Sequence, residues 1–276
     1  MNKIACKGIL VNTGRQCLAA CIPALLLSLH TQAQDDDLAA QLANPVASLI
    51  SVPVQVNWDD NFGANEEGSV FRTNIQPVIP FSLNDDWNLI SRTILPVIDQ
   101  DDVPSAGRGE SGIGDVVQSA FFSPQQPTES GLIWGVGPVA LLPSASDDSL
   151  GAEKWGIGPT GVVLKQQGSW TFGMLANHIE SFAGEDDRDD VSATFLQPFV
   201  TYITSSQTTF SFNTESTYDW KGEQWSVPLN FNVSQLLRFR NQIFQVGVGA
   251  RYWIDSPEFG PDGWGYRLNL VLLYPR

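Results

Sequence analysis

The stretch WGYRLNLVLLY, residues 264–274, decides the fold because its side chains alternate between apolar and polar at successive positions. Its apolar members share one face of an extended strand: Tyr266, Leu268, Leu270, Leu272 and Tyr274. Arg267 and Asn269 take the opposite face. Residues 225–236 and 70–81 alternate in the same way, and this pattern is typical of strands that face lipid on one side and a polar lumen on the other.

Working outward from these stretches, the chain divides into twelve predicted strands rich in Val, Ile, Phe, Trp and Thr. They are 46–57, 70–81, 87–98, 111–123, 131–143, 155–167, 169–181, 192–204, 208–218, 225–236, 242–253 and 264–274. The connections alternate between long and short. Of the 30 acidic residues, 21 fall in the six long connections, 58–69, 99–110, 144–154, 182–191, 219–224 and 254–263.

These features predict an all-β protein, a transmembrane antiparallel β-barrel of about 12 strands. A soluble sandwich would use shorter strands and would not collect its acids in alternate connections. Eight of the nine Trp residues lie at strand ends, where interfacial aromatic girdles form. Strands 131–143 and 192–204 are apolar on both faces, which predicts a partly apolar lumen.

Composition excludes several functions. Acids outnumber bases 30 to 15, which disfavours nucleic acid as a partner. All three cysteines lie in the first 21 residues, and His178 is the one histidine after residue 33. Disulfides, Cys/His metal sites and most Ser-His or Cys-His catalysis are therefore not expected, and no cofactor is indicated.

Residues 1–33 read as a secretory signal peptide: Lys3, Lys7 and Arg15 precede an apolar stretch, and Thr31-Gln32-Ala33 forms a small-x-small cleavage site. A lipobox ending at Cys21 is an alternative, although most of the apolar stretch follows it. Residues 34–45 would then form a short periplasmic N-terminal segment, with the barrel over 46–276. The sequence leaves open whether residues 35–43 plug the barrel.

Two features oppose an unbroken strand map. Prolines fall inside predicted strands, among them those at positions 77, 96, 138, 159, 198 and 228, where each removes a ladder hydrogen bond. Local bulges are the expected solution. Gly112-Ile113-Gly114-Asp115 opens a strand and not a helix, so it predicts a bend at the rim of the barrel and no dinucleotide loop.

Several segments resemble a bacterial outer-membrane "transporter" family that is often mislabelled neuromedin U. They include residues 44–55, 74–98, 112–115, 134–138, 154–166, 177–184, 194–199 and 213–220. The chain is also similar, more distantly, to the barrel family named for the meta-pathway of phenol degradation, with which it shares the GxGD element. The resemblance implies a Gram-negative outer-membrane barrel with a transport role, and it brings no catalytic residues. Where family members often carry Gly-Pro after the first strand, Gly63 here precedes Ala64.

Strand parity points a set of polar side chains into the lumen. They are Arg72, Asn74, Gln76, Arg92, Asp115, Asn213, Glu215, Asn230, Asn232, Arg251, Arg267 and Asn269. The arginines and acids could guide a solute through the barrel, or they could form a structural network, since charges in a narrow barrel must be paired or solvated. Twelve strands leave a modest passage, which favours a narrow channel over a general porin.

Function therefore has three candidate classes. The favoured one is a passive transporter or channel for small, hydrophobic or aromatic solutes, with no chemical step. A lipid-acting barrel enzyme is an alternative, because His178 lies near Asn177 and Glu180; a structural barrel with acidic surface loops is another. The acid run at residues 185–190 lacks the order of a calcium loop. Expected partners are the lipid bilayer with lipopolysaccharide, the barrel-assembly machinery that reads the strand ending at Tyr274, and a small solute.

Overall fold

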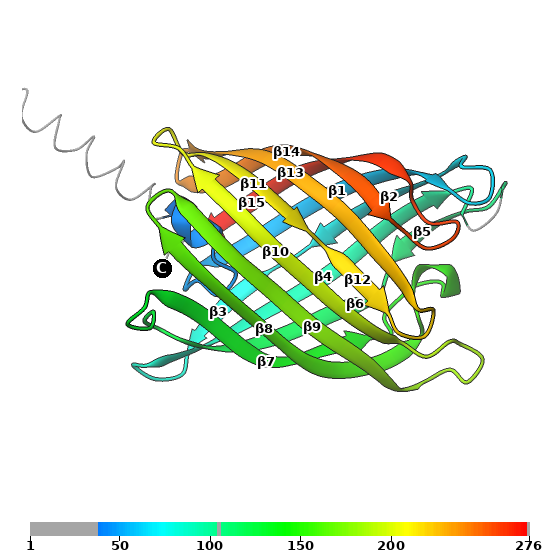
Figure 1. The fold of residues 1–276 in the computed structure, drawn as a ribbon, viewed down its shortest axis with the longest axis horizontal. Helices are drawn as coiled ribbons and strands as arrows, with labels where there is room; N and C mark the ends of the chain where they lie inside the picture. The colour runs from blue at the N-terminus through cyan, green and yellow to red at the C-terminus, as the bar shows by residue number, and fades with distance from the viewer. Residues whose placement is uncertain (1–37, 104–105, 275–276) are drawn as a thin grey trace, which may run out of the picture.

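A computed structural model describes residues 38–103 and 106–274, and its strands form one closed antiparallel sheet (Figure 1). The first strand, β1 (Ile50–Phe62), pairs with the last, β15 (Gly263–Tyr274), and so closes the barrel. The others are β2 (Gly68–Ile75), β3 (Val78–Ser82), β4 (Trp87–Asp101), β5 (Gly109–Ile113), β6 (Val116–Pro124), β7 (Leu132–Leu142), β8 (Lys154–Gln167), β9 (Trp170–Gly184), β10 (Ser192–Ile203), β11 (Thr208–Thr214), β12 (Ser216–Asp219), β13 (Gln224–Phe239) and β14 (Gln242–Asp255). The expected signal peptide lies outside the described residues.

Fifteen strand segments make twelve crossings of the barrel, because three crossings are interrupted. The pairs β2/β3, β5/β6 and β11/β12 each run in line and break at Gln76-Pro77, Gly114-Asp115 and Glu215. The predicted twelve-stranded antiparallel barrel is thus confirmed. The prediction of unbroken strands over 70–81, 111–123 and 208–218 is wrong, since each of these ranges is two segments.

Proline accounts for part of this irregularity. Pro77 separates β2 from β3, and a register shift lies between Val227 and Pro228. The expectation of a bulge at every strand proline is wrong elsewhere: Pro96 and Pro198 lie in continuous strands, and Pro138 and Pro159 face each other across the β7–β8 pair.

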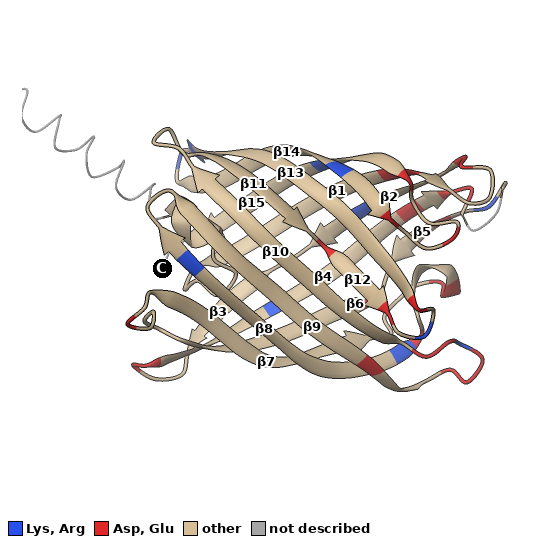
Figure 2. Ribbon diagram, viewed as in Figure 1, with Lys and Arg blue, Asp and Glu red and all other residues tan. Residues whose placement is uncertain are grey.

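Several strands run further into the acidic connections than their sequence suggests. β1 continues to Phe62 and β4 to Asp101, so both include carboxylates that the sequence placed in loops. At the other end β1 begins at Ile50, not at residue 46. Most of the long connections are correspondingly shorter than predicted, yet most acidic residues still lie at that end of the barrel (Figure 2).

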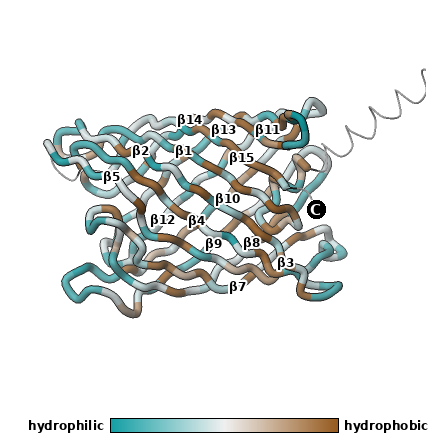
Figure 3. Tube along the Cα trace, turned by 180° about the vertical axis from the view of Figure 1, so that it is seen from behind, coloured by the Kyte–Doolittle hydropathy of each residue, from teal (hydrophilic) through white to brown (hydrophobic). Residues whose placement is uncertain are grey.

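Hydrophobic residues lie along the strands, and hydrophilic residues lie mainly in the connections at both ends of the barrel (Figure 3). Large apolar side chains on the outer surface of the barrel are exposed, among them Val136, Ile157, Phe231, Val248 and Leu268. Aromatic pairs such as Tyr252–Trp264, with ring centroids 5.0 Å apart, lie near the long-loop end. An apolar band with aromatic edges is the surface that a membrane-spanning barrel presents to lipid. Within the described residues, no helix is long and apolar enough to span a membrane.

The interior has two chemically different halves. Side chains of β11 to β15, β1 and β2 form a polar arc, which comprises Asn57, Asp59, Arg72, Asn74, Asn213, Glu215, Asn230, Asn232, Arg251, Arg267 and Asn269. The opposite half, from β4 through β6 to β10, carries an apolar arc of Ile90, Phe121, Ile133, Val162, Leu164, Leu175, Phe195 and Phe199. The prediction that β7 and β10 make part of the lumen apolar is confirmed by Ile133, Phe195 and Phe199.

The chain before β1 lies inside the barrel at the short-turn end. Residues 38–42 form a helical turn in which Leu38 and Ala39 are buried. Leu38, Ala47 and Leu49 pack against Leu236, Ile243 and Leu273 of the wall, and Val46 joins the apolar arc. Residues 38–49, here called the inner segment, therefore lie in the lumen and are held by apolar burial. Two hydrogen bonds from the wall add to this, from Gln166 Nε2 to the Ala40 carbonyl at 2.7 Å and from Asn88 Nδ2 to Ser48 Oγ at 2.8 Å.

The lipid-facing assignment can be tested on β14. Val248, which is 61% exposed on the apolar surface, is a mid-strand residue, whereas Ile254, 59% exposed, lies at the long-loop end of the strand. Replacing Val248 with Arg should lower the free energy of unfolding by about 2–4 kcal/mol, because the cation is then placed in hydrocarbon. Ile254→Arg should cost about 0–1 kcal/mol, because an interfacial cation stays hydrated. Denaturant titration in lipid vesicles measures both, and equal losses would contradict the membrane-spanning orientation.

Candidate functional site: the barrel lumen

The centre of the polar arc is an ion network around Glu215. The break between β11 and β12 occurs at this residue, and its carboxylate accepts two hydrogen bonds from Arg267, from Nη1 at 2.9 Å and from Nη2 at 2.7 Å. Arg251 Nη2 donates to the same carboxylate at 3.1 Å, and Arg251 Nη1 donates to Asp59 Oδ2 at 2.8 Å. Such charge-assisted and bidentate contacts fix the positions of the guanidinium groups.

Amide side chains complete this network. Arg267 Nε donates to Asn57 Oδ1 at 2.7 Å, and Arg251 Nε donates to Asn230 Oδ1 at 2.9 Å. Asn230 Nδ2 in turn donates to Asn213 Oδ1 at 2.9 Å. Two residues further along β13 and β15, Asn269 Nδ2 donates to Asn232 Oδ1 at 3.3 Å. The network thus contains five of the twelve side chains that strand parity pointed inward, namely Asn213, Glu215, Asn230, Arg251 and Arg267. Asn232 and Asn269 form a separate pair beside it.

Two further arginines stand apart from the network. Arg92 Nη2 donates to Gln76 Oε1 at 2.9 Å, at the β2/β3 break. Arg72 faces the lumen from β2 with its neighbour Asn74, and its side chain is exposed to the lumen. In the part of the chain that the structure describes, Arg72 has no hydrogen bond or ion pair.

The sequence analysis missed Asn57 and Asp59 as lumen residues. The prediction ended the first strand at residue 57 and placed Asp59 in a loop, whereas β1 continues through it and Asp59 Oδ1 accepts a hydrogen bond from Trp253 Nε1 at 3.0 Å. The alternation of Gln55, Asn57 and Asp59 with Val54, Val56 and Trp58 was the signal that could have shown this.

Asp115 serves the wall of the barrel at its rim. Its carboxylate accepts the backbone N–H groups of Ser144 and Ala145, both at 3.1 Å, and that of Ala152 at 2.6 Å. These contacts fold the β7–β8 connection, residues 143–153, onto the β5/β6 break. The expected bend at Gly114-Asp115 is thus an anchoring point for a loop.

This connection also fills part of the lumen at its long-loop end, and is called here the outer loop. It contains the short helix η1 (Asp148–Leu150), and Leu150 packs against Val70 and Ile98. Asp147 accepts hydrogen bonds from the Ser149 N–H and hydroxyl, and the backbone bond chiefly lowers the pKa of this carboxyl. Arg188, from the β9–β10 connection, pairs with Glu153 at 3.1 Å and donates to the Gly151 carbonyl. The two connections are thereby linked.

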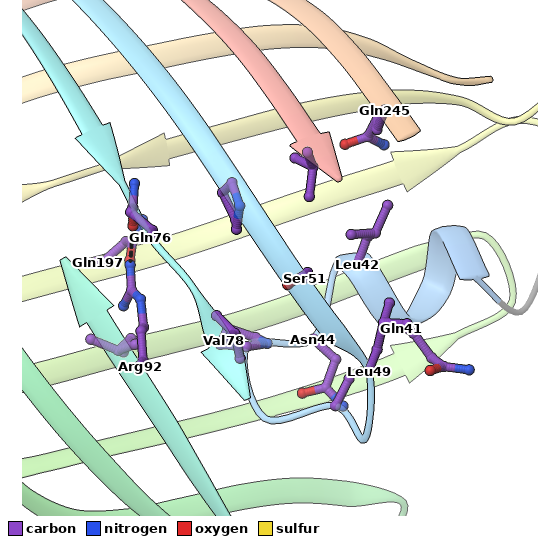
Figure 4. A pocket seen from close by; sticks show the side chains of 15 residues that line it. Gln41, Leu42, Asn44, Leu49, Ser51, Gln76, Val78, Arg92, Gln197 and Gln245 are labelled. Carbon is purple, nitrogen blue, oxygen red and sulfur yellow. Dashed lines mark hydrogen bonds between the residues drawn. The ribbon is translucent and has the colours of Figure 1, made fainter. Parts of the chain in front are cut away.

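Cavities remain on both sides of the Glu215 network. Two of them, of about 210 and 200 Å³, lie beside the inner segment. Figure 4 shows the first, where Gln76 and Arg92 face the inner segment across the lumen. The outer cavity, of about 280 Å³, lies towards the long loops and is lined by Asp59, Phe62, Val70, Arg72, Ser226, Arg251, Trp253, Pro257, Gly260 and Pro261.

His178 lies on the outward face of β9 and not in the lumen. Its Nδ1 is 2.9 Å from Thr194 Oγ1, and its Nε2 is 3.6 Å from Glu180 Oε2. Trp220 Nε1 also donates to Thr194 Oγ1, at 2.8 Å. In the acid run, Asp190 pairs with Lys154 at 3.3 Å. Among the described residues, no group of His, Cys, Asp and Glu side chains is arranged to hold a metal ion.

Comparison with known proteins defines the fold. No protein-family model and no curated protein sequence matches the chain, so membership of the family that its segments resemble is not shown. An outer membrane channel from Pseudomonas putida F1 is similar in structure, with a TM-score of 0.65 and 15% identity over 82% of this chain and 96% of that one. The β-domain of the Bordetella autotransporter BrkA matches with a TM-score of 0.43 and 10% identity, over 80% of this chain and 98% of that one. A loop-deletion mutant of OmpT, an outer membrane protein of Vibrio cholerae, gives 0.40 and 8%, over 82% and 98%.

Glu215 should be essential for the stability of the polar arc. Glu215→Gln leaves Arg251 and Arg267, whose side chains are 10% and 2% exposed, without their shared carboxylate. The free energy of unfolding should fall by about 3 kcal/mol, because removing one partner leaves buried charge uncompensated. Denaturant titration measures the change. Glu180→Gln, which removes a carboxylate from the outer face, should leave stability unchanged; a similar loss in both variants would contradict the role of the network.

Proposed function

We propose that the protein is an outer-membrane channel or transporter that lets small solutes cross passively, with no chemical step. The observation that carries the proposal is the lumen itself, where a polar arc and an apolar arc face each other and enclose cavities at both ends. A barrel of ~8 strands can fill its interior with side chains, whereas twelve strands enclose a wider lumen, which here retains cavities. The similarity of fold to a crystallised channel is consistent with this proposal.

The two-sided lumen also supports small hydrophobic or aromatic compounds as the solute class. The apolar arc offers contact area to an apolar body, and the arginines and amides offer hydrogen bonds to its polar groups. The resemblance of the sequence to bacterial transporter barrels favours the same class. The same proposal includes the localisation of the protein, which is the outer membrane of a Gram-negative bacterium. It also includes insertion into that membrane by the barrel-assembly machinery.

The inner segment then controls passage from the short-turn end. It occupies part of the lumen, and it contacts the wall through apolar packing and neutral hydrogen bonds, because none of residues 38–49 carries a charge. Such contacts can be broken and remade without separating charges. The acidic long loops would face the outside, near the divalent cations and lipopolysaccharide of the outer leaflet.

Single-channel recording in planar bilayers tests this function. The refolded mature protein should give small, discrete conductance steps, and a variant lacking residues 38–45 should give steps several-fold larger because the short-turn end is then unobstructed. Truncation within the exposed β6–β7 connection, residues 126–130, is the control and should leave the conductance small. Silence from a correctly folded, heat-modifiable barrel in both forms would reject the channel.

One observation bears on the alternative of a lipid-acting enzyme, the contact of Thr194 with His178 on the outer face. The active site of a nucleophilic hydrolase contains a hydroxyl, an imidazole and a carboxylate, each in contact with the next. Thr194, His178 and Glu180 supply these groups here, on the face of the barrel that is turned towards lipid. In this arrangement, however, the Thr194 hydroxyl also accepts the Trp220 indole N–H, and the Glu180 contact is longer than a hydrogen bond. We propose that the group is an interfacial polar contact without activity.

A lipid-hydrolysis assay separates the two roles. Refolded protein in phospholipid micelles should release no fatty acid, and His178→Ala should behave in the same way as the parent protein. Release by the parent that disappears in both His178→Ala and Thr194→Val would establish the enzyme and overturn the proposal of a barrel without a chemical step.

A further inference from the structure

We propose that the outer cavity is a binding site for a small carboxylate that carries an apolar body, and that Arg72 is the carboxylate ligand. This inference rests on the proposed transport function and specifies its solute class. It joins two observations: a lumen-facing arginine that has no hydrogen bond or ion pair among the described residues, and a cavity whose remaining walls are largely apolar.

Arg72 is the lumen arginine that the barrel leaves unpaired among the described residues. Arg251 and Arg267 share Glu215, and Arg92 donates to Gln76. Arg72 instead presents its planar guanidinium, with five N–H donors, to the cavity. That geometry matches the two oxygens of a carboxylate, which can accept parallel hydrogen bonds from one guanidinium.

The charge balance of the cavity favours an anion. Its ionisable lining residues are Arg72, Arg251 and Asp59, which gives one net positive charge. The Asp59 carboxylate is already held by Arg251 Nη1 and by Trp253 Nε1. Arg251 uses three of its five N–H groups for Asp59, Glu215 and Asn230, so two remain to reach a second anion.

The rest of the cavity is suited to an apolar body. Phe62, Val70, Trp253, Pro257 and Pro261 contribute apolar or aromatic surface to its walls. The volume of about 280 Å³ exceeds the ~150 Å³ of an apolar cavity that holds benzene, which leaves room for one ring and a carboxylate. Inorganic phosphate would leave these walls uncovered, and a neutral aromatic would leave Arg72 unpaired.

The same pairing of chemistries continues inward. Below the outer cavity, the polar arc carries arginines and amides down one half of the barrel, and the apolar arc covers the other half. A solute with a carboxylate on one side and an apolar body on the other can keep both contacts as it moves along the lumen. The outer cavity therefore has the same combination of polar and apolar walls as the lumen below it.

Isothermal titration of the refolded full-length mature barrel in detergent, with benzoate as the probe, tests the site. Benzoate should bind saturably. Acetate, which has no aromatic ring, and benzyl alcohol, which has no carboxylate, should each bind at least tenfold more weakly. Arg72→Ala should weaken benzoate binding at least tenfold. Arg72→Lys, which keeps the charge but loses the bidentate geometry, should weaken it less. Arg240→Ala, at an exposed turn on the opposite end of the barrel, should bind as the parent does.

The outcomes separate this inference from the proposed function. Benzoate binding that depends on Arg72 in a barrel that gives no conductance would support the site and reject transport. Conductance with no benzoate binding, or with binding unchanged in Arg72→Ala, would overturn the carboxylate site and leave the channel. Phosphate binding as tightly as benzoate would also overturn it, since the apolar walls would then contribute nothing. Circular dichroism and heat-modifiable migration confirm that each variant is folded.

Discussion

The ion pairs of Glu215 join parts of the barrel that lie far apart in the sequence. Asp59 and Asn57 belong to the first strand, Arg251 and Arg267 to the last two, and Glu215 reaches both arginines from the break between β11 and β12. The seam between β1 and β15 is therefore closed twice, by the backbone ladder and by charged side chains inside it. Because these contacts span about two hundred residues, they are expected to form late in folding, after the local hairpins.

The remaining interior is arranged around this seam. The polar arc follows the strands that carry the network, and the inner segment precedes β1 directly, so closure of the seam also encloses it. At the other end, Asp115 holds the outer loop against the wall, and Arg188 ties it to the neighbouring connection. The lumen is thus narrowed at each end by chain that the barrel itself anchors, while open volume remains on both sides of Glu215.

The strand count, the antiparallel closure and the inward direction of the polar side chains could be predicted from the sequence, because a period of two is a local property. The partners of those side chains could not, since Arg251 and Asp59 are brought together by barrel closure and not by spacing. The end of β1 was misplaced because acidic residues indicate a loop in a soluble context, whereas a lumen arginine can hold them within a strand. The position of the inner segment could not be predicted either. The sequence of residues 38–49 is compatible with a short helix anywhere, and only the closed barrel shows that this segment lies inside the lumen.

The acidic long loops have a consequence for any anion that approaches the barrel from their side. Arg72 attracts an organic anion once the anion has reached the outer cavity. At a distance, the carboxylates of the loops around the cavity repel the same anion. The range of that repulsion is set by the Debye length, which is ~30 Å at 0.01 M ionic strength and ~8 Å at 0.15 M. Salt would therefore speed the encounter with an organic anion rather than slow it, and divalent cations bound at the rim would do the same. The ionic composition of the surroundings would thus change the rate of entry at this end without a conformational change in the loops.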